Sequence, residues 1–450
     1  MSDRSPRLFV PPHPPRQPKP VASWRGFFGE RARTAVYGWS SQAFETDYIR
    51  RKILGFTVHV LLDPDMVGHV LLDNAANYAK PDIVRELLDP IIGAGLLTSD
   101  GELWREQRRI VAASFSPAAV KAQQSMFALA ARGAMSRWSD GDQIDMAAEA
   151  TRTTMTVIAL ALFGGDPRLT SDDSMRQITA AIEGFSEARL LALMRLPQFP
   201  VTRRGRAGKQ GQIHLRRTLA DVVADRWDGR IKGDFLCGLI DALRDRFPPE
   251  QARALAIDNA ATFYLAGHET TANALAWTLF LLAEQPALQE ELAQEARAVV
   301  GDDAEAIAGR LPRLRAFLQE SLRLYPPVPR FDRQAIGHDR IGEADISPGD
   351  IVSIWPWLLH RHTRLWNDPD AFIADRFVGS AERHRFQYLP FGGGVRICVG
   401  AQFAMTEALT LLAHWLSEWR FVRSGLPVRP AGMVTLRPAG GLRLTLERRT

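Results

Sequence analysis

The chain has 450 residues and carries 56 Lys and Arg against 51 Asp and Glu, a formal charge of +5. This excess is too small to indicate a nucleic-acid-binding protein. Hydrophobic residues make up 46% and charged residues 24%, an ordinary globular composition that excludes disordered, collagen-like and fibrous classes. Two cysteines, Cys237 and Cys398, are too few for a disulfide framework, and no secretory signal is recognisable. We therefore expect a folded protein of a reducing, cytoplasmic compartment.

The chain starts with a proline-rich segment. Residues 1–20 contain seven prolines, which exclude a helix and predict an extended, flexible lead. No break in composition follows and no internal repeat is present, so residues 21–450 are predicted to form a single large domain. Helical spacing dominates this part, and we expect a mainly α-helical domain with a small β-sheet.

The expected elements follow in chain order. Strand signals are confined to residues 56–62 and to 341–354, where a Ser-Pro-Gly-Asp sequence predicts a turn. Helices are predicted at residues 104–113, 143–163, 234–246, 250–284, 287–300, 314–324 and 403–419. Residues 203–211 are rich in arginine and glycine and are predicted to form a solvated, mobile loop, with a lid or a membrane-surface role as the alternative.

The longest expected helix, 250–284, would measure about 50 Å. Polar side chains in its middle argue against a membrane span. Small and polar residues recur along one face at helical spacing and predict a cavity wall: Asn259, Thr262, Ala266, Thr270 and Asn273. Ala266 and Gly267 remove side-chain bulk, which predicts a notch for a flat ligand or a small molecule. Polar residues stranded in a buried helix are the alternative.

Two residues at this notch are candidate catalytic groups. The Thr270 hydroxyl is expected to bond to the carbonyl of Ala266 and to bend the helix. Glu269 is expected to relay protons from solvent to the Thr270 hydroxyl. A second charged pair, Glu320 and Arg323, lies on the helix that ends before Pro326, but such (i, i+3) pairs are common and indicate no function by themselves.

The glycine-rich stretch 391–400 is the most informative part of the sequence. Three consecutive glycines permit a tight loop, and Cys398 comes just before a helical run that begins near Gln402. A helix N-terminus and loop N–H donors are expected to lower the pKa of the Cys398 thiol, which makes it a ligand or a nucleophile. Arg396 offers a fork for a carboxylate. A phosphate-binding loop, a zinc site and a buried structural cysteine are the alternatives, and Cys237 is taken as an inert residue.

Together these features resemble the cytochrome P-450 family, the haem-thiolate monooxygenases, from about residue 30 to the C-terminus. The resemblance rests on positions that occur in the family's order: Ala266-Gly267-His268-Glu269-Thr270-Thr271, Glu320 with Arg323, and Phe391, Gly394, Arg396, Cys398 and Gly400. Asp375-Arg376-Phe377 is similar to the family's Pro-Glu-Arg-Phe segment, although Ala374 and Asp375 depart from its first two residues. Because Arg376 is retained, the resemblance implies a structural network of Glu320, Arg323 and Arg376.

The resemblance implies haem b (iron protoporphyrin IX) between the long central helix and the cysteine-loop helix, with Cys398 as the axial ligand of the iron. Further haem-binding residues implied in this way are Trp104, Arg108, Ala266, Arg333, Phe391, Arg396 and Gly400, and Arg330 competes with Arg333 for a propionate. The implied activity is O₂ activation at the thiolate-ligated iron and hydroxylation or epoxidation of a substrate. Two electrons would come ultimately from NAD(P)H, and Glu269 and Thr270 would supply protons.

A mainly apolar small substrate is expected, because apolar residues dominate the segments that would form its pocket. The expected pocket residues are Leu87, Leu88, Ile92 and Leu97 on a loop spanning 83–97, together with Phe263, Ala266, Val328, Phe331 and Val434. Residues 433–436 would close the far wall, and Arg85 or Arg330 could anchor a carboxylate. A fatty acid, a terpenoid and an aromatic compound all remain open.

Electrons are expected from a separate ferredoxin and ferredoxin reductase, or a similar redox partner, since no flavin domain is recognisable. Arg105, Arg108 and Arg109, with residues 383–385, would form a basic face for an acidic ferredoxin, and scattered solvated charges are the alternative. Neither a nucleic acid nor a transmembrane anchor is expected. Rival functions are a haem-thiolate peroxygenase, a rearranging lyase, and a non-catalytic haem- or ligand-binding protein.

Overall fold

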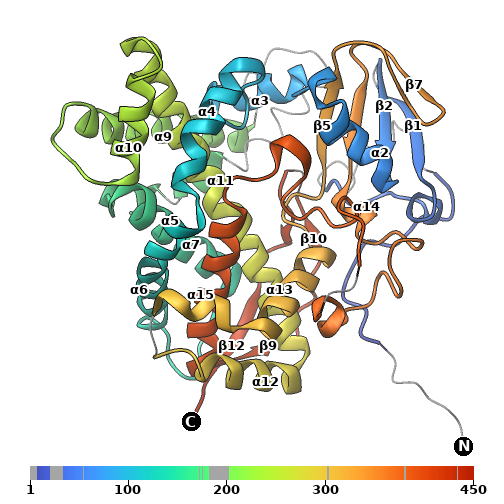
Figure 1. Ribbon diagram of the computed structural model, residues 1–450. Coiled ribbons are helices and arrows are strands. Elements are labelled where there is room, and N and C mark those ends of the chain that lie inside the picture. Colours follow the sequence, from blue (N-terminus) through green and yellow to red (C-terminus); the bar gives the residue numbers. More distant parts are fainter. Residues whose placement is uncertain are drawn as a thin grey trace, which may run out of the picture.

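The computed structural model describes residues 8–20, 34–53, 55–171, 173–174, 176–181, 202–301, 304–379, 382–432 and 434–450. Most helices lie on one side of the molecule and the largest sheet lies on the other (Figure 1). The α-helices are α2 (Pro64–Gly68), α3 (Asp82–Ile92), α4 (Gly101–Ser114), α5 (Pro117–Ala122), α6 (Gln124–Met135), α7 (Met146–Phe163), α9 (Arg203–Trp227), α10 (Phe235–Arg244), α11 (Pro249–Glu284), α12 (Pro286–Arg297), α13 (Pro312–Leu324), α14 (Pro356–Leu359) and α15 (Ala401–Glu418). The predicted fold class, mainly helical with a small sheet portion, is confirmed.

The largest sheet joins two distant parts of the chain. Its strand order is β1-β2-β8-β5-β3, and β2 pairs in parallel with β8 in the register Val58 to Ile351. The strands in the described residues are β1 (Tyr48–Ile53), β2 (Phe56–Leu61), β3 (Tyr78–Ala79), β4 (Gln143–Asp145), β5 (Phe331–Ala335), β6 (Asp339–Ile341), β7 (Ala344–Ile346), β8 (Ile351–Ile354), β9 (Trp419–Arg423), β10 (Pro430–Ala431), β11 (Arg437–Pro438) and β12 (Arg443–Arg448). Both predicted strand regions are therefore confirmed, and the second one divides into a hairpin and a sheet strand.

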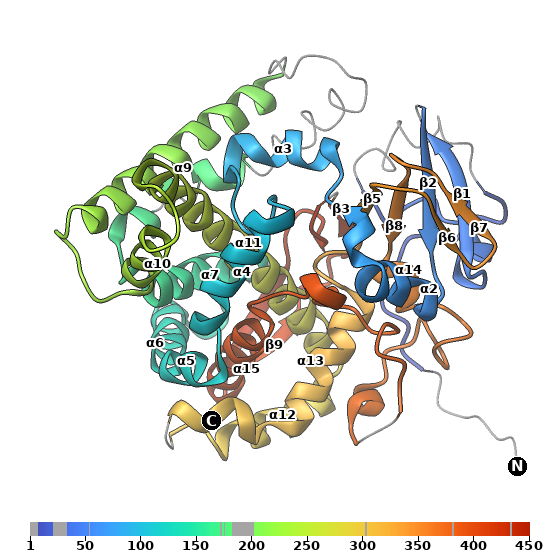
Figure 2. The same ribbon diagram turned by 45° about the horizontal axis from the view of Figure 1, so that its top comes forward.

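Helix α11 is the central element of the helical side (Figure 2). Its 36 residues contact α7, α9, α10, α13 and α15. Apolar residues cover nearly its whole circumference in the second half, which is typical of a buried helix. Trp277 stacks on Tyr325, at the end of α13, with ring centroids 3.8 Å apart. This packing places the middle of α11 at a fixed position in the protein interior.

Two segments that were predicted to be loops are helices. Residues 82–92 form α3, so only 93–97 of the expected loop are non-helical. Residues 203–211 form the first turns of α9, where the Thr202 hydroxyl caps the helix by accepting a hydrogen bond from the Gly205 amide at 3.0 Å. The glycines of α9 recur every three residues on a buried face, and a Cβ on Gly211 would lie 2.1 Å from the carbonyl oxygen of Gln177. These glycines serve close packing between backbones and not mobility.

The proline-rich lead is held to the domain along residues 8–17. The carbonyl of Phe9 accepts a hydrogen bond from the Phe372 amide, and the carbonyl of Pro12 accepts one from the Tyr325 hydroxyl. Arg16 pairs with Asp370, and the Gln17 amide donates to the carbonyl of Trp39. Prolines lack an N–H group but keep their carbonyls, which are available to donors of the folded domain. This part of the lead is therefore attached more firmly than its composition predicts.

Candidate active site

A large internal cavity separates the middle of α11 from the cysteine loop. Its volume is about 980 Å³, at the upper end of the range for small-molecule sites. The walls come from α3, α4 and α11, the first turn of α9, residues 327–333, the loop 389–400, α15 and the hairpin of β10 and β11. Most of the lining is apolar. A cavity of this size has room for a cofactor together with a small substrate.

The cysteine loop brings the Cys398 thiol into this cavity. The backbone amide of Cys398 donates to the carbonyl of Phe391 at 3.0 Å, which closes the loop just before α15 begins. Gly394 has a φ of +67°, and a Cβ there would lie 1.8 Å from the carbonyl oxygen of Leu71. Only glycine allows this close approach. The thiol is open to the cavity.

The thiol of Cys398 does not have the lowered pKa that the sequence predicted. Burial raises its pKa above the ordinary value, while the Gly400 amide and the nearby Arg108 act in the opposite direction with smaller effects. The loop and helix donors are present, but the protein that surrounds the sulfur disfavours the charged thiolate more strongly than these donors favour it. A metal ion bound to the sulfur would offset the cost of forming the thiolate here, because a thiol that coordinates a metal is deprotonated.

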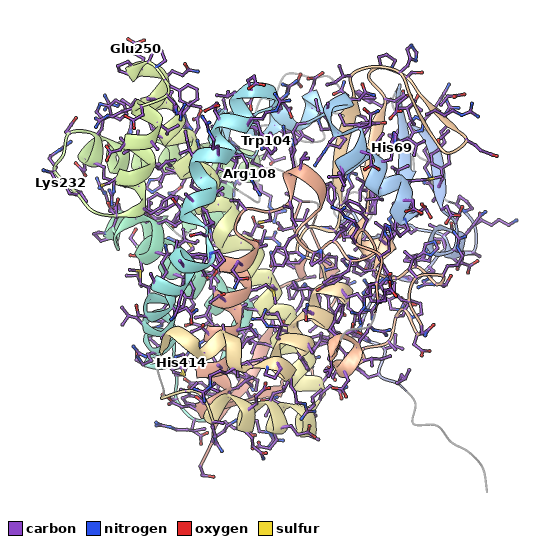
Figure 3. All side chains as sticks on the ribbon, viewed as in Figure 1. His69, Trp104, Arg108, Lys232, Glu250 and His414 are labelled. Carbon is purple, nitrogen blue, oxygen red and sulfur yellow. The ribbon has the colours of Figure 1, made fainter. Side chains whose placement is uncertain are left out.

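Basic side chains line the cavity on the side of the loop and α4. Trp104 and Arg108 lie one turn apart on α4 (Figure 3), and the Arg396 guanidinium lies 4.3 Å from the Trp104 ring centroid. Arg396 also pairs with Asp100. Burial is the main reason why the pKa of Arg333 falls to about 10, and the charge of Arg396 lowers it further.

Lys80 joins this basic wall, although its sequence context contains no signal for a binding role. It follows β3, which pairs with β5, and the same strand β5 carries Arg333. Burial is the main reason why the pKa of Lys80 falls to about 7, and the charges of Arg333 and Arg396 lower it further. Buried cations that lower each other's pKa would be stabilised by a bound anion. The wall therefore fits a ligand that carries carboxylates.

All eight residues predicted to bind the cofactor line the same cavity: Trp104, Arg108, Ala266, Arg333, Phe391, Arg396, Cys398 and Gly400. Arg330 is not in this wall; it pairs with Asp332 at 2.7 Å and lies over Trp355. Successive side chains of extended backbone point to opposite sides, so residues three apart face in opposite directions. Arg333 points inward from β5, and Arg330, just before the strand, faces the other side. A flat, dianionic, metal-containing group such as haem fits this combination of a thiol and clustered cations.

On the opposite wall, Thr270 and Glu269 both line the cavity. The Thr270 hydroxyl donates to the carbonyl of Ala266 at 2.8 Å, as predicted. Glu269 does not bond to Thr270. Its carboxylate accepts a hydrogen bond from the Thr435 hydroxyl, 2.5 Å away, on the connection between β10 and β11. The acid and the alcohol therefore share the wall but have different partners.

The predicted polar stripe on α11 is only partly a cavity wall. Thr262, Ala266 and Thr270 line the cavity. Asn259 is wholly buried, where it accepts from the Leu96 amide and donates to Gln107. A Cβ on Gly267 would lie 2.6 Å from the Ile158 side chain on α7, so this glycine serves the packing of the two helices as well as the notch.

The apolar part of the cavity contains eight of the nine predicted substrate residues: Leu88, Ile92, Leu97, Phe263, Ala266, Val328, Phe331 and Val434. Leu87 is the exception, because the helical conformation of α3 turns it to a different side from Leu88, where it is buried outside the cavity. Arg85 is an exposed partner of Asp82 and not a cavity residue. In the predicted far wall, Thr435 also lines the cavity, and residue 433 lies outside the described residues.

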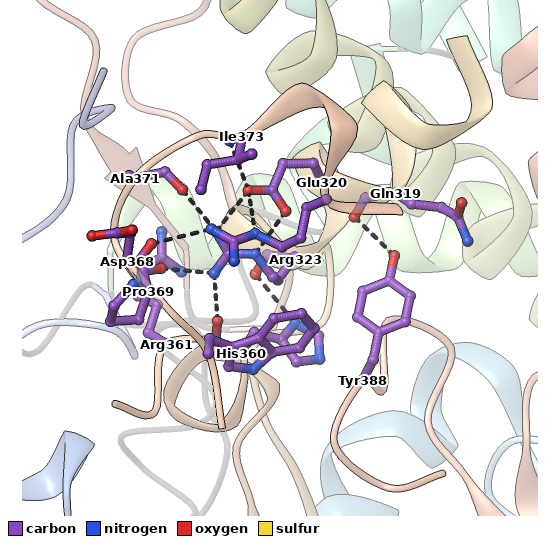
Figure 4. A network of polar contacts seen from close by, with 12 residues as sticks. Gln319, Glu320, Arg323, His360, Arg361, Asp368, Pro369, Ala371, Ile373 and Tyr388 are labelled. Carbon is purple, nitrogen blue, oxygen red and sulfur yellow. Dashed lines mark hydrogen bonds and ion pairs between the residues drawn. The ribbon is translucent and has the colours of Figure 1, made fainter. Parts of the chain in front are cut away.

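The predicted ion-pair network is formed, as Figure 4 shows for Glu320 and Arg323. Glu320 and Arg323 are fully buried and form two hydrogen bonds of 2.7 and 2.8 Å, and Arg376 donates to Glu320 at 3.0 Å. Arg323 also donates to the carbonyls of His360, Pro369 and Ala371. The His360 ring in turn accepts from the Leu389 amide, two residues before Phe391. The network thus connects α13 to the segment that leads into the cysteine loop.

Two further sequence expectations concern Cys237 and membrane spans. Cys237 is half-buried on α10, and its Sγ donates to the carbonyl of Ile231 at 3.5 Å. Burial is the main reason that its pKa is raised, in agreement with an unreactive thiol.

Within the described part of the chain, no helix has both the length and the hydrophobicity needed to cross a bilayer.

Comparison with known proteins agrees with this geometry. The family model described as Cytochrome P-450 matches residues 42–438. Cyclooctatin synthase of Streptomyces melanosporofaciens is 32% identical over 429 residues, covering 93% of this chain and 92% of the relative. Lutein Deficient 5 of Arabidopsis thaliana is 30% identical and covers 87% and 70% of the two chains, and a cytokinin hydroxylase of the same plant is 28% identical and covers 86% and 78%.

The family match spans most of the domain and includes every element that contributes to the cavity wall between α3 and β11. The family implies a haem cofactor, for which the thiol of Cys398 and the basic wall provide fitting groups. The relatives named as hydroxylases agree with this chemistry. The chain therefore belongs to the cytochrome P-450 family and is a monooxygenase of the P-450 type.

Proposed function

We propose that this enzyme hydroxylates or epoxidises a small, mainly apolar organic substrate at a haem bound through the Cys398 thiolate. The observation that supports this proposal most strongly is that one cavity contains the thiol, the basic wall, the apolar residues and the acid and alcohol of α11. The haem, when bound, supplies the iron at which O₂ is activated. Arg108, Arg333 and Arg396 would hold its propionates, with Trp104 beside them.

The residues of the chain would have separate tasks in this reaction. The apolar walls formed by α3, α11 and residues 327–331 would orient the substrate and exclude water from it. The hydroxyl of Thr270 would hold a proton close to the reacting oxygen, and Glu269 would bring protons from solvent to that hydroxyl. Burial raises the pKa of Glu269, which keeps the proton on this carboxyl to a higher pH than for an exposed glutamate.

A Thr270→Ala variant is expected to form about tenfold less product per NADH oxidised, because the hydroxyl that holds the proton is lost. Electrons would then leave as peroxide. The measurement is the ratio of product to NADH with a compound selected because it shifts the ferric haem to high spin. Thr270→Ser keeps the hydroxyl and should retain the ratio. A Thr270→Ala enzyme that remains fully coupled would exclude this role of the hydroxyl.

The electrons would come from NAD(P)H through a separate redox partner, an acidic ferredoxin with its reductase. Support comes from Arg105 and Arg109, whose side chains are more than half exposed on α4, the helix that also carries Arg108. Each of the two is paired with a glutamate one turn earlier, which reduces the net positive charge at this face below the sequence-based expectation. Arg383 is also engaged, since it donates to the carbonyl of Arg376.

Reversing Arg105 and Arg109 to Glu is expected to slow the first electron transfer from an acidic ferredoxin about tenfold at low ionic strength, and less in high salt. Stopped-flow reduction under carbon monoxide measures this rate. A matched control reverses Arg246 and Arg253, which are exposed and lie within four residues of Glu250 in the sequence; Figure 3 labels Glu250. Equal rates and equal salt dependence for the two double variants would refute docking at α4.

A further inference from the structure

The acid of α11 is bound to a residue 166 positions away in the sequence. The Glu269 carboxylate accepts a 2.5 Å hydrogen bond from the hydroxyl of Thr435, and both residues line the cavity. Thr435 is 8% exposed. The contact therefore links the long helix to the β10–β11 hairpin across the cavity wall.

The hairpin holds Thr435 in a fixed place. At the next residue, the Leu436 amide donates to the carbonyl of Pro327 at 2.8 Å, and the Leu436 carbonyl accepts from the Trp277 indole at 3.0 Å. On the other side, Gly432 has a φ of +124°, and a Cβ there would lie 1.8 Å from the carbonyl oxygen of Thr435. The carbonyl of Gly432 accepts from the Ala35 amide at 3.0 Å. These contacts anchor Leu436 on one side of Thr435 and Gly432 on the other, and a β-branched side chain has few rotamers.

The charged and polar groups around Glu269 act in different directions. Burial raises the pKa of Glu269, whereas the Thr435 hydroxyl and the charge of Arg437 on β11 lower it. On α11 itself, His268 is turned away, with its Nδ1 2.5 Å from the carbonyl of Tyr264, and burial lowers its pKa to about 4. His268 is therefore neutral near pH 7 and adds no charge beside Glu269.

We infer that Thr435 is a positioning residue for proton supply: its hydroxyl holds Glu269 on the hairpin, and the carboxyl must leave it to reach Thr270. The Thr270 hydroxyl is itself bonded to the carbonyl of Ala266, so both partners of the transfer are engaged elsewhere at rest. A hydroxylation consumes two protons, and for each of them the carboxyl gives one proton to Thr270 and regains one from solvent. This inference rests on the proton relay of the proposed function.

Infrared titration of the purified haem protein tests the contact without a substrate or a redox partner. The protonated carboxyl band that is absent in Glu269→Gln belongs to Glu269, and its loss with rising pH gives a midpoint. Thr435→Val removes a hydroxyl that favours the carboxylate, so its midpoint is expected to rise by about one pH unit. Thr435→Ser keeps the donor and should retain the wild-type midpoint.

A matched control removes another buried threonine hydroxyl of α11. Thr278→Val loses hydrogen bonds to the carbonyl of Ala274 and to Ser321, and its Glu269 midpoint should equal that of the wild type. If Thr435→Val yields no haem protein, Thr435→Ala takes its place. A Thr435 variant that lacks the hydroxyl and titrates like the wild type would overturn the inference.

The pH dependence of coupling separates this inference from the proposed relay. With a surrogate ferredoxin and reductase, the pH at which product per NADH falls to half should be higher in Thr435→Val than in the wild type and in Thr435→Ser. A Glu269→Gln enzyme that stays coupled would refute the relay, whatever Thr435 does. An uncoupled Glu269→Gln enzyme together with an unshifted Thr435→Val profile would refute only the role of Thr435.

Discussion

Replacing Glu320 with alanine is expected to lower the free energy of unfolding by about 3–5 kcal/mol, enough to prevent accumulation of folded haem protein. Both Glu320 and Arg323 are fully buried, and the substitution leaves the guanidinium of Arg323 without its counter-ion. Arg376 and the Ile373 amide also lose their shared acceptor on Glu320. The measurement is the yield of haem protein and, where enough is obtained, its denaturant midpoint.

A pair with the same spacing provides the control for this prediction. Asp241 and Arg244 are three residues apart on α10, and both face solvent with their charged groups 3.8 Å apart. Asp241→Ala is expected to change stability by less than about 1 kcal/mol. If Glu320→Ala were as stable as Asp241→Ala, the network could not be what secures the approach to the cysteine loop.

The second large effect is expected at the thiol. Cys398→Ser should abolish product formation, because the serine hydroxyl does not supply the thiolate that the bound haem requires. The fold should remain, since the backbone amide at this position still donates to the carbonyl of Phe391. Product formation and circular dichroism of the same preparation test both statements. The control is Cys237→Ser, at a thiol that lies outside the cavity, which should keep full activity.

The sequence predicts those parts of the site that are formed by residues close together in the chain. The central helix is recognisable from its length and composition, and the bond from the Thr270 hydroxyl to the carbonyl of Ala266 follows from a spacing of four residues. The glycines before Cys398 predict a tight loop that ends in a helix, and the structure has both. Such features depend on neighbours in the chain, and a single sequence contains them.

Other features depend on tertiary contacts and could not be predicted. Lys80 enters the basic wall only because β3 pairs with β5, and Thr435 meets Glu269 only because the C-terminal hairpin folds over α11. The pKa of Cys398 was predicted to fall, because the N–H donors are visible in the sequence and the burial that outweighs them is not.

Glycine was the most misleading residue type in the sequence. In residues 203–211 it indicated a loop, but there it forms the buried face of a helix. At Gly267 it indicated a notch for a ligand, and Gly267 does line the cavity, but its missing side chain also makes room for Ile158 of α7. The absence of a side chain is compatible with a turn, a ligand site and close helix packing, and only the tertiary structure distinguishes these three.

The central claim is that the Cys398 thiolate binds the haem iron in the cavity between α11 and the cysteine loop. The most direct measurement is the carbon monoxide difference spectrum of the reduced, purified protein, recorded beside that of Cys398→His. A strongly red-shifted Soret band in the wild type that disappears in the variant is the predicted result. A histidine-type band in the wild type, or a purified protein without haem, would contradict the claim.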